Sequence, residues 1–190
     1  ASAQYVAESD LSKGEIVKLS PHVWYIKGNP NVAIIVGAGA TLVVDTGLGP
    51  KNGATVAAAA QKLSPPGNRL YLTTTHYHPE HASGDTGFPA GTQVIRPRAQ
   101  EQEYQQGGAA MSEAARGRAA GNRSLLEGAR VKPADIVFDG EMHTVDLGGG
   151  VVANILWYGA AHTVGDELVW ADPDGVLVTA RLPRRLVNRF

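Results

Sequence analysis

The sequence contains no cysteine, and this absence removes several kinds of chemistry at once. A chain without cysteine forms no disulfide, has no thiol nucleophile and offers no thiolate to a metal ion. Any metal that it binds must therefore be held by histidine, aspartate or glutamate. The absence leaves the cellular compartment open, because proteins without disulfides occur in every compartment.

Long apolar runs and a strong net charge are also missing. No run approaches the roughly 20 apolar residues that a membrane-spanning helix needs, so we expect no membrane span. The formal net charge of −1 gives no overall attraction to nucleic acid, and we expect no nucleic-acid partner. With 43% hydrophobic and 18% charged residues, the 190 residues have the composition of one globular domain over 1–190.

The first residues carry a weak sign of export. Ala1, Ser2 and Ala3 have the small–x–small pattern found around signal-peptidase sites. No basic or apolar signal region precedes them in this sequence, so we expect a periplasmic or secreted protein whose signal peptide has been removed, and a cytoplasmic one otherwise. Residues 1–14 are expected to be a flexible N-terminal segment.

Apolar periodicity and turn residues divide the remaining chain into strands and helices. Strand patterns fall at 15–26 (broken at Ser20 and Pro21), 31–36, 41–44, 70–75, 92–96, 136–138, 142–145, 151–158, 168–171 and 176–179. An alanine-rich helix is predicted at 52–63. Residues 98–128 have few large apolar side chains and predict one or two interrupted helices that cover the core as a lid. The order indicates an α/β (α+β) fold with helices outside sheets, and a four-layer αββα sandwich fits it.

Three of the six histidines lie within residues 74–81, directly after a strand pattern, in the order Thr-Thr-His-Tyr-His-Pro-Glu-His. His76 and His78 are two positions apart, so both project from one face if the strand continues. Pro79 suits the first position of a helix, whose turn brings Glu80 and His81 back over the same point. Because imidazole is the commonest protein ligand of zinc, the pattern favours a metal site over a polar surface loop.

A further histidine, His162, follows the strand pattern at 151–158 and is flanked by small residues. A single histidine in that place is ordinarily a surface residue. Its repeat of the strand-to-histidine placement favours a site of three histidines, with an open position for water, as in catalytic zinc sites. His22 and His143 lie near no comparable motif, and we expect neither to bind metal.

Three motifs, in this order and spacing, resemble those of the metallo-β-lactamase-fold hydrolase superfamily. They are Asp45-Thr46-Gly47, the Thr-His-x-His-x-Glu-His run at 75–81, and Ala161-His162-Thr163-x-Gly165-Asp166. The likeness extends from about Val17 to the end of the chain, and the His-x-His-Pro-Glu-His form resembles a bacterial branch of the superfamily. The resemblance implies the αββα sandwich of the metallo-β-lactamase type.

The resemblance also implies roles for the residues that match these motifs. His76, His78 and His162 correspond to the ligands of a first zinc ion. Glu80 and His81 correspond to ligands of a second ion, and Asp45 braces the loops from below.

The sequence departs from the family pattern in two places that concern the second ion. Glu80 stands where the family usually has aspartate, and Arg181 occupies the position of the bridging acid. The chain then ends at Phe190, before the region that supplies the family's last metal-binding histidine, so it resembles a relative without its C-terminal part. Because arginine repels a cation, we expect at most one tightly bound zinc ion.

These observations predict a zinc-dependent hydrolase acting on a small molecule. Zinc lowers the pKa of its water toward about 7, and the resulting hydroxide would attack a carbonyl-type group while Glu80 orients the water and accepts its proton. A β-lactam or related cyclic amide or ester ranks first, and a thioesterase resembling glyoxalase II second. A non-catalytic metal-binding relative that has lost its bridging acid is the alternative from another class. Substrate contacts are expected from the loop before Asn31 and from residues 98–128.

Overall fold

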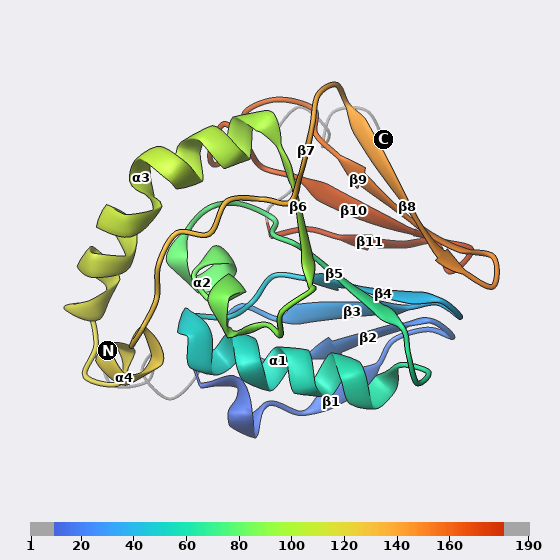
Figure 1. Ribbon diagram of the computed structural model, residues 1–190, viewed down its shortest axis with the longest axis horizontal. Helices are drawn as coiled ribbons and strands as arrows, with labels where there is room; N and C mark the ends of the chain where they lie inside the picture. The colour runs from blue at the N-terminus through green and yellow to red at the C-terminus, as the bar shows by residue number, and fades with distance from the viewer. Residues whose placement is uncertain (1–9, 181–190) are drawn as a thin grey trace.

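Two β-sheets lie face to face, with helices on the outer side of the first, in a computed structural model that describes residues 10–180 (Figure 1). The first sheet contains, side by side, β1 (Ile16–Lys18), β2 (Val23–Ile26), β3 (Val32–Val36), β4 (Ala40–Val44), β5 (Arg69–Thr73), β6 (Gln93–Pro97) and β7 (Ile136–Phe138). Its first four strands are antiparallel, whereas β4 to β7 are parallel. The second sheet is antiparallel, in the order β11 (Val176–Val178), β10 (Leu168–Asp172), β9 (Val151–Leu156) and β8 (Met142–Gly148). The predicted order of strands and helices is confirmed.

The main core lies between the two sheets. Ile35 and Leu42 of the first sheet pack in one cluster with Leu147, Ile155 and Val169 of the second, and none of the five is exposed. The strands of the two sheets differ in how they are buried. β3 and β4 are buried along their whole length because both faces of the first sheet are covered, whereas β9 alternates between buried and half-buried residues.

At one corner the two sheets meet backbone to backbone. Gly39 N donates to Leu147 O at 2.9 Å. A Cβ at the neighbouring Gly37 would lie 2.2 Å from Leu147 O, so only glycine permits this approach.

The helix α1 (Gly49–Leu63) forms the layer on the other face of the first sheet (Figure 1). Its Val56 and Ala60 are buried with Ile34 and Leu72 in a second apolar cluster. Removing these side chains from water, at about 25 cal/mol per Å² of apolar surface, holds the helix on the sheet.

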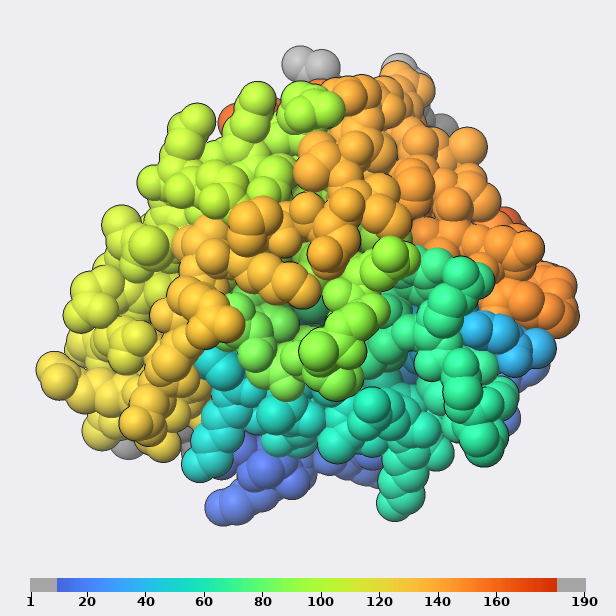
Figure 2. All heavy atoms as spheres, in the orientation of Figure 1, coloured from blue at the N-terminus to red at the C-terminus, as the bar shows by residue number. Residues whose placement is uncertain are grey.

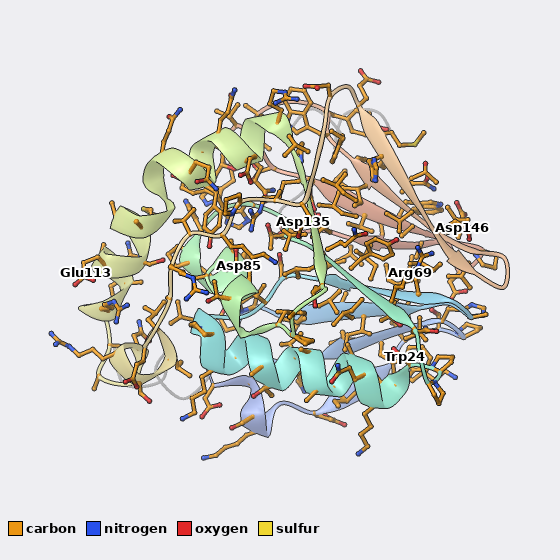
Figure 3. All side chains as sticks on the ribbon, in the orientation of Figure 1. Trp24, Arg69, Asp85, Glu113, Asp135 and Asp146 are labelled. Atoms are coloured by element: carbon orange, nitrogen blue, oxygen red, sulfur yellow. The ribbon has the colours of Figure 1, made fainter. Side chains whose placement is uncertain are left out.

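The remaining helices are α2 (Pro79–Ala82), the 3-10 turn η2 (Asp85–Gly87), α3 (Arg98–Arg116) and α4 (Asn122–Leu125). Figure 1 shows α3 arching from the end of β6 toward α4, and in Figure 2 the chain after α4 crosses the surface beside α3 on its way to β7. Glu113 marks the outer side of α3, pointing away from the sheets (Figure 3). None of the described helices is long and apolar enough to cross a lipid bilayer.

The prediction that 98–128 serves only as a cover is wrong for part of α3. Gln100 and Tyr104 are almost fully buried, and Ala115 and Leu125 form a small apolar cluster with Leu48. A polar side chain such as Gln100 can be buried because its hydrogen-bonding groups find partners there. Low apolar content therefore did not indicate exposure.

The flexible segment predicted for 1–14 is also wrong for its last residues. The 3-10 turn η1 (Leu11–Lys13) packs against α1, with the Leu11 side chain 2% exposed and Leu11 N donating to Asn52 Oδ1 at 2.9 Å. The buried Leu11 side chain and this hydrogen bond together hold the short segment on α1. Residues 1–9 and 181–190 lie outside the described residues, and with them Arg181.

The outer face of the second sheet has no helix over it within residues 10–180. Met142, Trp170 and Leu177 are 56%, 37% and 41% exposed there. Three layers, α, β and β, of the expected four-layer sandwich are thus described, and the described helices contact the first sheet and one another.

Candidate metal centre

The histidine cluster begins where β5 ends, beside the end of β4. Because β4 and β5 are parallel, the residues that follow them meet at the same edge of the sheet. Asp45 follows β4 and its N donates to Thr73 O at 2.9 Å. Asp45 has a left-handed φ of 74°, a conformation that aspartate tolerates better than most residues.

The carboxylate of Asp45 lies beneath the loop that carries the first histidines. Its Oδ1 accepts a hydrogen bond from Thr75 N at 2.7 Å, and Thr75 Oγ1 lies 3.0 Å from each oxygen. Its Oδ2 accepts from His81 Nδ1 at 2.8 Å. Because a carboxylate can only accept, the proton of this bond sits on His81 Nδ1, and Nε2 is left for another partner.

The short helix α2 begins at Pro79, as the sequence predicts, and turns the chain back over His76. The rings of His76 and His81 have centroids 4.1 Å apart, and those of His76 and His78 are 4.7 Å apart. His76 is 3% and His81 8% exposed.

His162 reaches the same point from the second sheet, on the loop between β9 and β10. Its ring centroid lies 5.2 Å from that of His76 and 4.9 Å from that of His78. One ligand nitrogen from each of these three rings lies within 4.8 Å of the other two. The structure thus assembles the three-histidine set that the sequence predicts.

The surroundings of His78 and His81 shift the pKa values of these two rings in opposite directions. Burial lowers the pKa of His78, and the neighbouring histidines lower it further against the opposing effect of Glu80. His78 is therefore held in the neutral form, which is the form that binds metals. Burial also lowers the pKa of His81, but the Asp45 carboxylate outweighs it, so that the pKa of His81 is raised.

The donor set fits a zinc ion. Three imidazoles converge, the pKa of one is lowered toward the neutral form, and no thiolate competes, a composition typical of catalytic zinc sites. Within residues 10–180 this is the one group of three or more such side chains placed to hold a metal ion. Glu80 and His81, which we predicted as ligands of a second ion, line the cavity beside this group, and the second site stays a prediction.

A cavity of about 1040 Å³ opens beside the cluster. Its polar wall includes Glu80 and His162, and its apolar wall includes Trp24, Val176 and Val178. Residues of the loop at 28–31 and of the region at 115–122 also line it, and they belong to the two segments from which the sequence predicts substrate contacts.

Sequence reasoning missed most of the groups that hold His162 in place. Asp166 accepts hydrogen bonds from the backbone N–H groups of His162 and Thr163. Its place in the motif at 161–166 was a usable signal. Gln100 and Glu103, which contact the same loop from α3, carry no signal in the sequence.

The two histidines set aside at the sequence level stay outside the cluster. His143 stacks on Phe138, with ring centroids 5.5 Å apart. His22 does have a partner that the sequence did not indicate, since its Nδ1 lies 2.7 Å from Asp174 Oδ1.

Comparison with known proteins agrees with this geometry. A family model described as the metallo-beta-lactamase superfamily matches residues 25–182. A metallo-beta-lactamase with a HARLDQ motif from Cronobacter sakazakii superposes with a TM-score of 0.63 and 18% identity, over 92% of this chain and 64% of that one. The FEZ-1 metallo-beta-lactamase of Legionella gormanii superposes with a TM-score of 0.59 and 19% identity, over 81% of this chain and 56% of that one. The inverting sec-alkylsulfatase Pisa1 of a Pseudomonas species superposes with a TM-score of 0.61 and 16% identity, over 83% of this chain and 29% of that one.

The chain spans less than two thirds of the length of each of these three structures. At such identities the likeness concerns the fold alone. Comparison with curated protein sequences gives no match.

Proposed function

Because the chain belongs to the metallo-β-lactamase superfamily, we propose that it is a zinc-dependent hydrolase whose ion is held by His76, His78 and His162. The observation that carries the proposal is the convergence of three imidazoles, which follow strands of two different sheets, beside a cavity that two of them, His76 and His162, line. When bound, zinc supplies a nucleophile from water at neutral pH and stabilises the negative charge that develops on the substrate.

The other residues of the cluster have roles that follow from their contacts. Asp45 fixes the ring of His81 through Nδ1, so that Nε2 faces a defined direction. Glu80 lines the cavity next to His76 and His81, and its carboxylate can take a proton from a water molecule there and return it to the leaving group. Glu80 is therefore our candidate for the general base.

The cavity supports a substrate with both a polar and an apolar part. Its volume of about 1040 Å³ lies at the upper end of the roughly 300–1000 Å³ usual for small-molecule sites. Trp24 and Val178 contribute apolar surface to the cavity that His76 and His162 also line. We rank a β-lactam or another cyclic amide or ester first and a thioester second. Export to the periplasm or medium remains a proposal from the sequence.

The test compares three alanine variants of the purified chain. His78→Ala and His162→Ala should each lose tight zinc binding, by more than the roughly 100-fold that removal of an outer hydrogen-bond partner costs, and lose all hydrolysis. His143→Ala changes a histidine that lies outside the cluster, stacked on Phe138, and should keep both zinc binding and hydrolysis. Zinc content by atomic emission and turnover of a chromogenic β-lactam and a chromogenic thioester are the measurements.

Two results would contradict parts of the proposal. Unchanged zinc content in His162→Ala would show that the three histidines do not act as one site. Stoichiometric zinc without turnover of either substrate would favour a metal-binding relative that is not an enzyme for these substrate classes.

A further inference from the structure

The loop that carries His162, residues 157–166, is the exposed half of the histidine cluster. Val164 is 51% exposed, and His162 itself is exposed. Within the loop, Asp166 binds the N–H groups of His162 and Thr163, and Trp157 Nε1 donates to Val164 O at 2.9 Å. These local bonds give the loop a shape, but they do not fix its distance from the other two histidines.

Contacts from α3, together with the backbone hydrogen bond from Glu167 N to Thr75 O at 2.9 Å, hold the loop beside those two histidines. Glu103 accepts a hydrogen bond from Val164 N at 3.0 Å with one carboxylate oxygen and from Gly165 N at 2.8 Å with the other. A carboxylate that accepts two backbone N–H bonds makes charge-assisted bonds, which are stronger than bonds between neutral groups.

Gln100, one turn earlier on α3, bonds to both halves of the cluster at once. Its Nε2 donates to Gly165 O at 2.9 Å and to Thr74 O at 2.7 Å, and its Oε1 accepts from Thr74 Oγ1 at 2.6 Å. Thr74 precedes His76 by two residues, and Gly165 follows His162 by three. The side chain is fully buried, so water does not compete for these bonds.

The loop also touches α3 too closely to be repositioned without cost. A Cβ at Gly165 would lie 2.3 Å from Gln100 Cα and 2.4 Å from its Cβ, so the glycine is needed for this approach.

We propose, on the basis of the zinc site assigned above, that Gln100 and Glu103 are positioning residues that set the distance of His162 from His76 and His78 and thereby the affinity for zinc. Neither residue belongs to the group of three histidines placed to hold the ion. Each acts through the backbone of the loop, and α3 becomes the rigid part against which the third ligand is held.

Three variants test this inference from independent directions. Gln100→Met keeps the volume and removes the three hydrogen bonds, Glu103→Ala removes the two bonds to the loop, and Gly165→Ala leaves both side chains but forces the loop away. Each should raise the dissociation constant for zinc by about 10- to 100-fold, measured by chelator competition. Each should also change the visible absorption bands of the cobalt-substituted protein, which report ligand geometry. Glu103→Gln retains one of the two acceptor oxygens and should restore only part of the affinity.

Two controls separate positioning from general destabilisation. Gln106→Ala changes an exposed residue of the same helix, and Val56→Ala weakens the core at α1 without touching the loop. Both should keep the zinc affinity and the cobalt spectrum of the unmodified chain.

A measurement on the metal-free protein completes the design. In the presence of a chelator, the amides of Val164 and Gly165 should exchange with solvent at least 10-fold faster in Glu103→Ala than in the unmodified chain. Faster exchange with an unchanged zinc affinity would overturn the positioning role while leaving the proposed function intact. Failure of the unmodified chain to bind zinc would overturn the proposed function, and this inference with it.

Discussion

Glu167 is a buried carboxyl group next to the histidine cluster. The residue is 2% exposed, and its N donates to Thr75 O at 2.9 Å. Thr73 Oγ1 lies 2.8 Å from Ile95 O and 2.5 Å from Glu167 Oε1. A hydroxyl has one hydrogen and cannot donate to both, so a neutral Glu167 that shares its own proton satisfies the arrangement. Burial, reinforced by the nearby Asp45, raises the pKa of Glu167 well above its usual value.

Glu167→Gln should change how stability depends on pH. In the unfolded chain Glu167 ionises near the ordinary glutamate pKa of about 4.5, whereas in the folded protein it stays neutral to higher pH. Its contribution to the free energy of unfolding is thus complete below about pH 4.5 and is lost as pH rises toward the folded pKa, at up to roughly 1.4 kcal/mol per pH unit. Glutamine is neutral throughout, so the variant should become more stable relative to the parent between pH 5 and 7 in urea unfolding with a chelator present. Parallel pH profiles would show that Glu167 is ionised in the fold.

At the scale of elements, one side chain of β6 joins three segments that are distant in the sequence. Arg96 is fully buried and bonds Asp85 of η2 at 2.9 Å, Glu101 of α3 at 3.0 Å and Lys132 O at 2.9 Å. Its guanidinium also lies 4.4 Å from the centre of the Tyr104 ring. Figure 3 shows Asp85 inside the molecule, near α2. The packing of α3 and η2 on the first sheet therefore depends on Arg96 and its two carboxylate partners.

Arg96→Met should lower the free energy of unfolding by about 3–5 kcal/mol, because it leaves the Asp85 carboxylate buried without a counter-charge. The second variant Arg96→Met/Asp85→Asn should recover part of that loss. The control is Arg98→Met, since Arg98 pairs with Asp139 on the surface and both side chains are exposed. Urea unfolding at pH 7 measures all three, and equal stability of Arg96→Met and the parent would refute the account.

The features that could be predicted from the sequence are those that depend on residues close together in the chain. The strand periodicities, the Pro79 helix start and the paired His76 and His78 all depend on neighbours within a few residues. The buried polar groups could not be predicted in this way. Arg96 and Gln100 look like surface residues in the sequence, and only partners far along the chain make their burial possible.

At the scale of the whole molecule, the candidate metal centre joins the two sheets. His76 and His78 follow β5 of the first sheet, and His162 follows β9 of the second. An ion bound by all three stabilises the folded chain by mass action, about 2.7 kcal/mol at a free concentration 100 times the dissociation constant.

Chelation should therefore lower the thermal midpoint by roughly 5–10 °C for a domain of this size. Calorimetry with zinc and then with excess chelator measures the shift. His162→Ala should abolish it, and His143→Ala should retain it. A midpoint that is the same with and without zinc in the parent would rule out tight binding by the folded state.

Because His162 follows a strand of the second sheet, zinc binding should also affect the rates of folding and unfolding differently. The three ligands come together only when the two sheets dock. We expect this docking to follow the folding barrier, so that an ion meets no complete site before it. Zinc should then leave the refolding rate nearly unchanged and act almost entirely on unfolding, slowing it in proportion to the affinity gained. The lifetime of the folded chain would be set by how long the ion resides between the sheets.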